Sequence, residues 1–302
     1  SIAKGFQVGS LTDFNTVYNW GKDKDLITIE IENVNVEALL KLKAEGVTIY
    51  PQPEVIKIIQ DKRTQKQFYK EKSIPTADFI LTDSIEEVKA NSSFLPAFQK
   101  LGQSGYDGRG VQRLDSIADL PKALEGKSLL EKKVDYAKEL SVIVSRNAKG
   151  EVSAFPVVEL VFHPEHNLVD LLFAPAAISK EVEKRATDIA IKVITELNMV
   201  GLLAVELFLE KNGNILVNEV APRPHNSGHQ TIEANSTSQY EQHLRAILNL
   251  PLGSTRQLTP AAMVNLLGEA GFSGPTKYEG LEEALSIDAV SYTHLTLPTN
   301  RE

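Results

Sequence analysis

One short stretch of this chain constrains its fold more than any other, residues 206–220, where two runs rich in apolar residues flank Asn212-Gly213. Asn-Gly is a strong hairpin signal, because a type I′ turn needs positive φ at both central residues. A turn at these two residues pairs Glu206 directly with Glu219. Carboxylates that face each other across a ladder repel, so a cation between them is expected, and Mg²⁺ commonly binds one or two carboxylates together with substrate phosphates. The alternative is a solvated hairpin that tolerates two glutamates.

The composition excludes several classes of protein. With 302 residues, of which 42% are hydrophobic, the chain can bury a substantial core and is expected to form two or three domains. Its formal net charge of -8 argues against broad nucleic-acid or membrane surfaces, although local phosphate sites remain open. The absence of cysteine excludes disulfides, thiolate metal sites and thiol nucleophiles. No apolar run reaches the roughly 18 residues of a membrane helix, so a soluble, cytoplasmic protein is expected.

The first 76 residues predict part of a parallel βαβ unit. Strands are expected at 25–32 and 47–50, on either side of a helix at 36–44 that stops at Gly46. A second helix is expected from 54 to 72, because its apolar residues recur at helical spacing. The proline of Ile74-Pro75-Thr76 then marks a domain boundary.

From residue 77 to residue 252 the pattern is typical of mixed α+β structure. Strands are expected at 95–100, 128–134, 140–146 and 152–161, and helices at 179–197 and 238–248. A further strand is expected at 287–290. Both ends of the chain are expected to be incomplete, and residues 291–302, which have no clear helical period, are interpreted as a tail foreign to the fold.

A glycine-rich segment, residues 100–111, lies in a polar stretch after the strand expected at 95–100. Its glycines permit close approach of backbone amides to phosphate oxygens, and Lys100 and Arg109 could add charge. The segment is neither a Walker A loop nor a Rossmann fingerprint. Taken alone, it fits a phosphate-binding flap and a surface hairpin loop about equally well.

The strand exit at 131–134, which reads Glu-Lys-Lys-Val, is followed by Glu139. Backbone groups there could bind an adenine, and the carboxylate of Glu139 could bind a ribose. The alternative is that these are ordinary charged residues at a strand end.

Residues 221–229 read Ala-Pro-Arg-Pro-His-Asn-Ser-Gly-His and cannot form regular structure, because two prolines interrupt both helix and ladder. A rigid loop that carries Arg223 directly after a metal carboxylate indicates an anion site, since arginine suits phosphate geometry. Zinc is the competing interpretation, with His225, His229 and Glu233 as ligands. The intervening Asn-Ser-Gly opposes the helix that this set needs, and the zincin glutamate is absent.

Together these segments resemble the ATP-grasp ligases. The resemblance rests on residues 105–110, Glu131 with Glu139, Glu206 with Asn218-Glu219, and residues 221–229. Segments 59–66, 74–76 and 238–246 extend it over most of residues 20–290. The Pro-Arg-Pro-His-Asn-Ser-Gly-His run narrows it to the branch that carboxylates 5-aminoimidazole ribonucleotide in purine biosynthesis.

The resemblance implies an ATP-grasp fold of α/β and α+β type. Its expected parts are a partial pre-ATP-grasp βαβ domain (1–76), the ATP-grasp domain (77–252), a partial carboxy-terminal domain (253–290) and the foreign tail (291–302). The implied reaction joins bicarbonate to the amine of 5-aminoimidazole ribonucleotide through carboxyphosphate, while ATP is cleaved to ADP and phosphate. The implied cofactors are ATP and Mg²⁺, and the implied assembly is a homodimer without nucleic-acid or membrane partners.

The resemblance also assigns roles to individual residues. Mg²⁺ would be held by Glu206 and Glu219, and catalysis would fall to Arg223, His225 and Asn226, which with Ser227 would also bind the substrates. ATP would be bound by Lys62, Lys100, Gly105, Tyr106, Asp107, Gly108, Arg109, Gly110, Glu131, Lys132, Lys133, Val134, Glu139, Asn218 and Glu219. No ATP-contacting histidine is assigned, because the segment carrying His163 and His166 differs in length from the family pattern.

Two departures from the family pattern leave alternatives open. The family's Gly-Gly-Gly-Gln-Leu-Gly-like loop and its Arg-Lys-Met-Gly-His-like segment, which both serve the ribonucleotide, have no counterpart in these 302 residues. We expect the ATP site to be retained in outline. The alternatives are another ATP-grasp ligase, such as a glycinamide ribonucleotide or biotin carboxylase-like enzyme, and a nucleotide-binding fragment without turnover.

Overall fold

The computed structural model describes residues 5–103, 110–162, 169–266 and 278–291. The chain divides into two compact units, Ser1–Met263 and Val264–Glu302. Among the described residues no helix is long and apolar enough to cross a membrane. The domain boundaries predicted after residues 76, 252 and 290 stay predictions.

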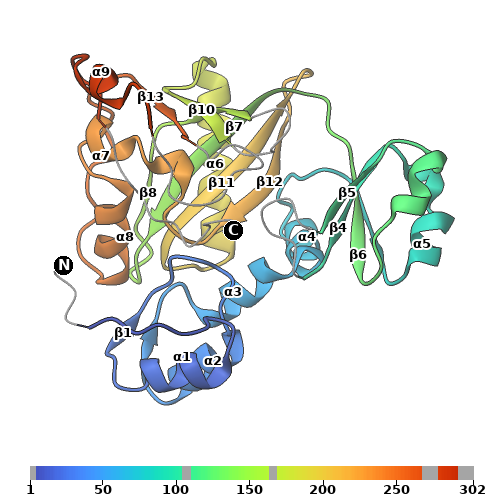
Figure 1. Cartoon of the computed structure of the whole chain (residues 1–302), viewed down its shortest axis with the longest axis horizontal. Helices are drawn as coiled ribbons and strands as arrows, with labels where there is room; N and C mark the ends of the chain where they lie inside the picture. Colours follow the sequence, from blue (N-terminus) through green and yellow to red (C-terminus); the bar gives the residue numbers. More distant parts are fainter. Residues whose placement is uncertain (1–4, 104–109, 163–168, 267–277, 292–302) are drawn as a thin grey trace. The chain divides into compact units, whose positions relative to one another are not determined.

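The amino-terminal part is the predicted parallel βαβ unit (Figure 1). It contains α1 (Phe14–Gly21), β1 (Leu26–Ile27), α2 (Val36–Ala44), β2 (Thr48–Ile49) and α3 (Pro53–Gln60). Apolar side chains of both strands and of α2 and α3 form its core. The strand predicted at 25–32 is much shorter, because β1 pairs with β2, which is itself two residues long.

The prediction of a single helix from 54 to 72 is wrong, because the helix is interrupted at Asp61. This residue has extended backbone angles (φ -113°, ψ 106°), and its carboxylate accepts hydrogen bonds from the amides of Arg63 and Thr64. Asp61 therefore caps a separate helix, α4 (Lys62–Glu71), in the manner of an N-cap aspartate. The break places Lys62 at the first residue of α4.

A small antiparallel sheet follows, with the strand order β3-β6-β4-β5. Its strands are β3 (Phe79–Thr82), β4 (Ala97–Leu101), β5 (Val111–Leu114) and β6 (Ser128–Lys132), with α5 (Ile85–Ala90), η1 (Ser92–Phe94) and η2 (Ile117–Lys122) between them. The predicted strands at 95–100 and 128–134 correspond to β4 and β6. The strand β6 ends at Lys132, so Lys133 and Val134 lie beyond it.

The larger sheet has the order β12-β11-β7-β9-β10-β13, with β8 paired to β7. Its strands are β7 (Tyr136–Arg146), β8 (Val152–Ala154), β9 (Val158–Phe162), β10 (Val169–Ala174), β11 (Gly201–Glu210), β12 (Ile215–Ala221) and β13 (Ala261–Val264). The strand predicted at 152–161 is two strands, because Pro156 lies between β8 and β9 and cannot donate to a ladder. In Figure 1 the strands β12, β11 and β7 lie side by side.

One face of this sheet packs against α6 (Lys180–Glu196), a helix that the sequence predicts. Leu140, Val142 and Val144 of β7 point to that face, so Ser141 and Ser145 of the same strand point to the other. On the second face lie η3 (Asn226–Gly228), α7 (Thr231–Ala234) and α8 (Gln239–Ile247), the last of which the sequence also predicts. This second face carries the polar residues discussed below.

The turn between β11 and β12 differs from the predicted one. The amide of Gly213 donates to the carbonyl of Glu210 at 2.9 Å, so the central turn residues are Lys211 and Asn212. Of the turn residues only Gly213 has positive φ (87°), and the side chain of Asn212 accepts from the Asn214 amide at 2.8 Å. A turn followed by a left-handed glycine is a three-residue hairpin loop, and the type I′ prediction is wrong.

A β-bulge then restores the predicted pairing of the two glutamates. Next to the turn Leu207 faces Val217, one residue out of the expected register, and Asn218 is the extra residue that shifts it. Glu206 therefore faces Glu219, as predicted. The apolar pattern of β12 is consistent with the bulge. Val217 and Val220 both reach the core although they are three residues apart, whereas core residues of a regular strand are two apart.

In the second unit the structure describes α9 (Leu281–Leu285). The strand predicted at 287–290 is wrong, since the amide of Ile287 donates to Ala284 and that of Val290 donates to Ile287. Ala289 has positive φ (64°), so the segment turns instead of extending.

Candidate active site

Three polar side chains lie in a row across the second face of the larger sheet. Glu219 of β12 pairs with Glu206 of β11, and Glu206 pairs in turn with Ser141 of β7. Directly paired residues in antiparallel strands point to the same face, so all three side chains lie on the side away from α6. The sheet itself thus fixes the positions of the two carboxylates.

The two carboxylates differ in their electrostatics. Burial, together with the negative charges of Glu219 and Glu139, raises the pKa of Glu206 to about 8. Desolvation acts to raise the pKa of Glu219 too, but the ion pair with Lys62 (Nζ to Oε1, 2.8 Å) offsets this and lowers it. The Glu219 side chain is 54% exposed and that of Glu206 only 17%, so one carboxylate is solvated and paired while the other is held neutral near pH 7.

A buried group of charges, Lys66, Lys100 and Glu131, lies near this pair. Glu131 of β6 is 4% exposed and forms ion pairs with Lys66 of α4 and with Lys100 of β4, the latter at 2.6 Å. Burial acts to raise the pKa of Glu131, but the two lysines lower it to about 2. Lys66 also contacts the hydroxyl of Thr76, which donates to the Val217 carbonyl of β12 at 2.8 Å. This group of charges thereby connects the small sheet to β12, the strand that carries Glu219.

The other residues predicted to bind ATP lie in several elements, and some lie outside the described residues. Gly105, Tyr106, Asp107, Gly108 and Arg109 lie outside the described residues, and the Gly110 carbonyl accepts from the Leu101 amide at 2.8 Å. Lys132 donates to the Phe94 carbonyl at 2.9 Å, and Lys133 lies 3.6 Å from Asp115. Val134 is half-buried after β6, and Asn218 forms the bulge. Burial raises the pKa of Glu139, which a hydrogen bond from Tyr136 partly offsets.

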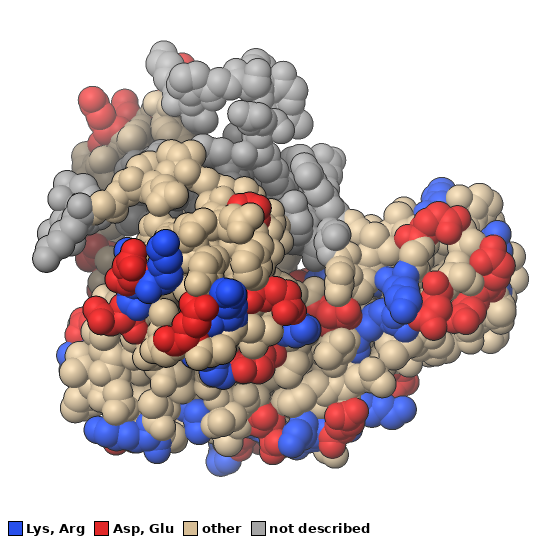
Figure 2. Space-filling model, turned by 90° about the horizontal axis from the view of Figure 1, so that it is seen from below, with Lys and Arg blue, Asp and Glu red and all other residues tan. Residues whose placement is uncertain are grey.

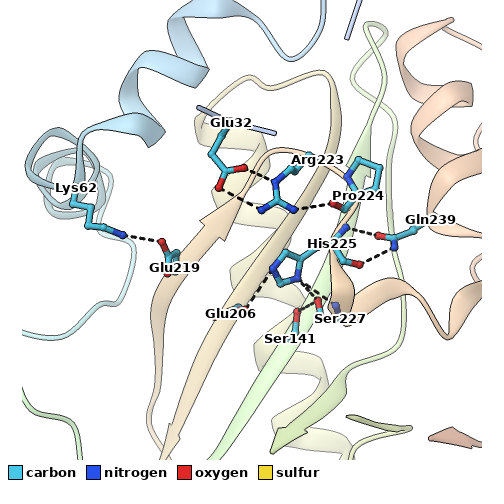
Figure 3. A network of polar contacts seen from close by, with 10 residues as sticks. All are labelled: Glu32, Lys62, Ser141, Glu206, Glu219, Arg223, Pro224, His225, Ser227 and Gln239. Carbon is cyan, nitrogen blue, oxygen red and sulfur yellow. Dashed lines mark hydrogen bonds and ion pairs between the residues drawn. The ribbon is translucent and has the colours of Figure 1, made fainter. Parts of the chain in front are cut away.

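The loop after β12 is held by one buried glutamine of α8. The Gln239 amide accepts from the His225 backbone N–H at 2.9 Å and donates to the His225 carbonyl at 2.7 Å (Figure 3). It also lies 3.1 Å from Nδ1 of His229. Gly228 packs so close to Gln239 that any side chain there would collide with the amide. The loop is therefore held rigidly. The prediction that residues 221–229 form no regular structure is wrong in part, because Ala221 ends β12 and Asn226–Gly228 form η3, after the two prolines.

Arg223 and Asn226 complete the predicted anion site. The Arg223 guanidinium forms an ion pair with Glu32 of the βαβ unit and donates to the Pro224 carbonyl at 3.1 Å (Figure 3). The buried Oδ1 of Asn226 has no hydrogen-bond partner within the described part of the chain. His225 lies between Glu206 and Ser227, with its Nε2 at 3.8 Å from Glu206 Oε1. The predicted substrate residues and the metal carboxylates thus lie next to each other.

The geometry argues against the zinc interpretation. Burial, with the positive charges of Arg223 and His229, lowers the pKa of His225 to about 3, and burial and Arg223 lower that of His229 to about 4. Both rings are thus neutral, which is the form that binds metals, so these pKa values do not oppose zinc and the contacts of the rings decide the question. His229 Nδ1 is engaged by Tyr240 and Gln239. Within the described ranges, no group of three or more histidine, aspartate or glutamate residues could hold a metal ion. His163 and His166 lie outside those ranges.

Four residues that sequence reasoning did not assign take part in the site: Glu32, Lys66, Ser141 and Gln239. Lys66 and Gln239 fall within segments that carry the family resemblance, so a signal for them existed. Glu32 and Ser141 carry no local signal, because each acts on a residue that is more than 80 positions away in the sequence.

Comparison with known protein families gives two matches. Residues 67–240 match the family described as the ATP-grasp domain. Residues 1–60 match the ribonucleotide synthetase preATP-grasp domain.

Individual relatives agree with these families. The N5-carboxyaminoimidazole ribonucleotide synthase of Bacillus subtilis is 41% identical over 252 residues, which are 81% of this chain and 65% of that protein. The crystal structure of N5-carboxyaminoimidazole ribonucleotide synthetase from Thermotoga maritima is 44% identical, with a TM-score of 0.83 over 92% of this chain and 74% of that one. The Aspergillus clavatus synthase in complex with ADP and 5-aminoimidazole ribonucleotide is 33% identical, with a TM-score of 0.81 over 89% and 72% of the two chains. The chain spans less than two thirds of the Bacillus protein's length.

Proposed function

The chain belongs to the ATP-grasp family, in its N5-carboxyaminoimidazole ribonucleotide synthase branch, and from this premise we propose that it carboxylates 5-aminoimidazole ribonucleotide with bicarbonate and ATP. The observation that carries the proposal is the adjacency of the Glu206–Glu219 pair to the loop of Arg223 and His225. Two carboxylates suit a metal-bound nucleotide, and a half-buried arginine and imidazole suit a small anion.

The carboxylate pair fits Mg²⁺, which we propose is held by Glu206, Glu219 and the phosphates of ATP. Burial and the negative charges of Glu219 and Glu139 raise the pKa of Glu206, and a divalent cation beside it would favour its charged form. Few protein ligands are expected for this ion, because Mg²⁺ keeps several waters and takes substrate phosphates as ligands. When bound, Mg²⁺ would neutralise charge on the phosphoryl group during transfer.

Lys62 and Lys100 are the cations available to the ATP phosphates. In this structure both lysines are paired with carboxylates, Glu219 and Glu131 respectively. Binding of Mg²⁺ at Glu219 would release Lys62 toward the phosphates, since the cation replaces the lysine as the partner of that carboxylate. We propose that Gly105–Gly110 covers the phosphates, that residues 131–134 line the adenine and that Glu139 binds the ribose.

The anion side would perform the chemistry in two steps. An oxygen of bicarbonate attacks the γ-phosphorus, the bond to the bridging oxygen breaks, and ADP leaves with that oxygen. The resulting carboxyphosphate gives its carboxyl group to the exocyclic amine, which loses a proton, and phosphate leaves. Such a sequence needs positioned charge more than covalent help, and we assign that role to Arg223, His225 and Asn226, with Ser227 as a further substrate contact.

ADP release under substrate omission tests the reaction. We expect Mg²⁺-dependent ADP formation that needs both bicarbonate and 5-aminoimidazole ribonucleotide, while glycinamide ribonucleotide gives no stimulation. Stimulation by glycinamide ribonucleotide alone would assign the chain to another ATP-grasp ligase. Binding of ATP without any stimulated turnover would mark it as a nucleotide-binding fragment.

We also propose a homodimer, from the family resemblance alone, a cytoplasmic location, and, from the net charge of -8, that the protein binds no nucleic acid. The face drawn in Figure 2 supports the last point, since acidic and basic side chains are interspersed over its coloured surface. Sedimentation of the purified chain tests the dimer, and a monomer at micromolar concentration would contradict it.

A further inference from the structure

The ring of His225 has different partners at its two nitrogens (Figure 3). Nε2 points toward Glu206, at 3.8 Å from Oε1. Nδ1 lies 2.9 Å from the hydroxyl of Ser227 and 3.3 Å from the backbone amide of the same residue. Nε2 therefore faces the carboxylate pair, and Nδ1 faces the loop.

The backbone amide of Ser227 indicates which ring nitrogen of His225 carries the proton. A backbone N–H can only donate, and it donates to Nδ1 of His225. Nδ1 must therefore present its lone pair, and the proton of the neutral ring is on Nε2. The opposite tautomer would place two N–H groups against each other at this contact.

Ser141 fixes the direction of the hydroxyl that also contacts Nδ1. Its side chain is fully buried, and its hydroxyl lies 2.8 Å from that of Ser227. Because Nδ1 already accepts from the Ser227 amide, the Ser227 hydroxyl beside it donates to Nδ1 as well, and the Ser141 hydroxyl then donates to the Ser227 oxygen. The pairing of Ser141 with Glu206 in the β7–β11 ladder places this hydroxyl beneath the loop.

We propose that Ser141 and Ser227 hold His225 as the Nε2–H tautomer, so that its ring donates a hydrogen bond to the reacting anion and does not act as a base. Ser141 is then a positioning residue that acts through Ser227. The inference rests on the proposed function, because the anion is the bicarbonate or carboxyphosphate of that reaction. A ring with its lone pair at Nε2 would instead repel an anion.

Nitrogen NMR of the metal-free chain with ¹⁵N-labelled histidine tests the tautomer without any turnover. The spectrum distinguishes protonated from unprotonated ring nitrogens, and the His225 signals among the six histidines are assigned by their loss in His225→Gln. We expect the Nε2–H form alone in the unaltered chain. Ser227→Ala keeps the backbone amide at 3.3 Å from Nδ1 but loses the closer hydroxyl at 2.9 Å, so we expect the Nδ1–H form to gain population there, and to a smaller extent in Ser141→Ala. An Nδ1–H ring in the unaltered chain, or unchanged spectra in both variants, would overturn the proposal.

A second serine of β7 supplies the matched control. Ser145 is equally buried, and its hydroxyl donates to the Ser153 carbonyl at 3.2 Å instead of to the loop. We expect Ser145→Ala to leave the His225 spectrum unchanged. Thermal unfolding of Ser141→Ala and Ser145→Ala shows whether the loss of a buried hydroxyl has altered the fold itself.

Kinetics then separate a positioning role from a structural one. Because one hydrogen bond contributes about 0.5–1.5 kcal/mol, Ser141→Ala should raise KM for bicarbonate about two- to tenfold, with KM for ATP unchanged. His225→Gln keeps an N–H donor but has no basic nitrogen, so it should retain more activity than His225→Ala. Equal loss in both His225 variants, or equal changes in both KM values for Ser141→Ala, would overturn the proposal. No turnover by the unaltered chain, with the Nε2–H tautomer present, would instead contradict the proposed function.

Discussion

Glu206 and Glu219 face each other across the β11–β12 ladder, yet only Glu219 forms an ion pair with a lysine. Glu206 has a neutral imidazole at 3.8 Å and an elevated pKa, so it is protonated near neutral pH. The pair thus carries one negative charge, balanced by Lys62. A cation that binds between the two carboxylates must displace a proton from one and a lysine from the other.

Glu206→Gln should remove a pH dependence of stability from the metal-free chain. The folded pKa of about 8 lies above the ordinary value of 4.5, so the stabilisation is complete below about pH 4.5 and is lost as the pH rises through about 8. Within this window the unaltered chain should lose up to about 1.4 kcal/mol per pH unit relative to the variant. Thermal unfolding in the presence of a chelator measures the difference. A constant gap between the two proteins from about pH 5 to about pH 9 would contradict the assigned pKa.

Glu219→Gln should abolish Mg²⁺-dependent turnover while the hairpin stays folded. We expect a loss of about 100-fold or more, the scale seen when one group that stabilises transition-state charge is removed. Stability should change little, because the loss of the ion pair with Lys62 is offset by the loss of charge repulsion with Glu206. ADP release at increasing Mg²⁺, together with circular dichroism, gives both readouts. Unchanged activity would contradict the metal assignment.

Glu131→Gln should destabilise the chain strongly. The substitution leaves Lys66 and Lys100 without the carboxylate that they share in a buried site, a change that typically costs about 3–5 kcal/mol. Urea unfolding measures the loss. The matched control is Glu159→Gln. Its lysine partner, Lys138, is 30% exposed and can be solvated, and the Ala177 amide, which also donates to Glu159, can still donate to the glutamine oxygen, so the loss should be smaller. Equal losses in the two variants would show that burial of the charges does not decide the effect.

Arg223→Ala should weaken use of the ribonucleotide or bicarbonate by about 10- to 100-fold, since hydrogen bonds to charged groups contribute about 1.5–3 kcal/mol. ATP affinity should change much less, because Arg223 pairs with Glu32, and Figure 3 draws Arg223 and Lys62 on opposite sides of Glu219. Arg245→Ala is the control, an exposed arginine paired with Glu241 within α8. A larger loss in ATP affinity than in ribonucleotide use would contradict this division.

The pairing of Glu206 with Glu219 could be predicted from the sequence, although the predicted turn was displaced by one residue and the bulge was not predicted. These two differences change the register in opposite directions and cancel. The turn lies one residue earlier than Asn212-Gly213 implies, and the bulge at Asn218 returns the register by one residue. The spacing of Val217 and Val220 carries the signal for that bulge, because a regular strand keeps core residues two apart. Local pattern was therefore sufficient for the hairpin and for helices with clear caps, such as α6 and α8.

Contacts between distant segments could not be predicted in the same way. Ser141 and Glu32 act on residues of the loop that follows β12, and only the folded sheet order brings them there. The ion pairs of Glu131 could not be predicted for the same reason. Its sequence context suggested a contact with adenine and gave no sign of Lys66 and Lys100. Asp61 was missed because the apolar pattern continues through it, while its capping hydrogen bonds end one helix and begin another.

Transfer of ¹⁸O from labelled bicarbonate tests the central claim most directly, that this site phosphorylates bicarbonate before it carboxylates the ribonucleotide. If an oxygen of bicarbonate attacks the γ-phosphorus, that oxygen stays with phosphorus when the carboxyl group leaves. Mass spectrometry of the phosphate released in the presence of 5-aminoimidazole ribonucleotide should then show one ¹⁸O atom per turnover. Unlabelled phosphate formed together with the carboxylated product would contradict the account.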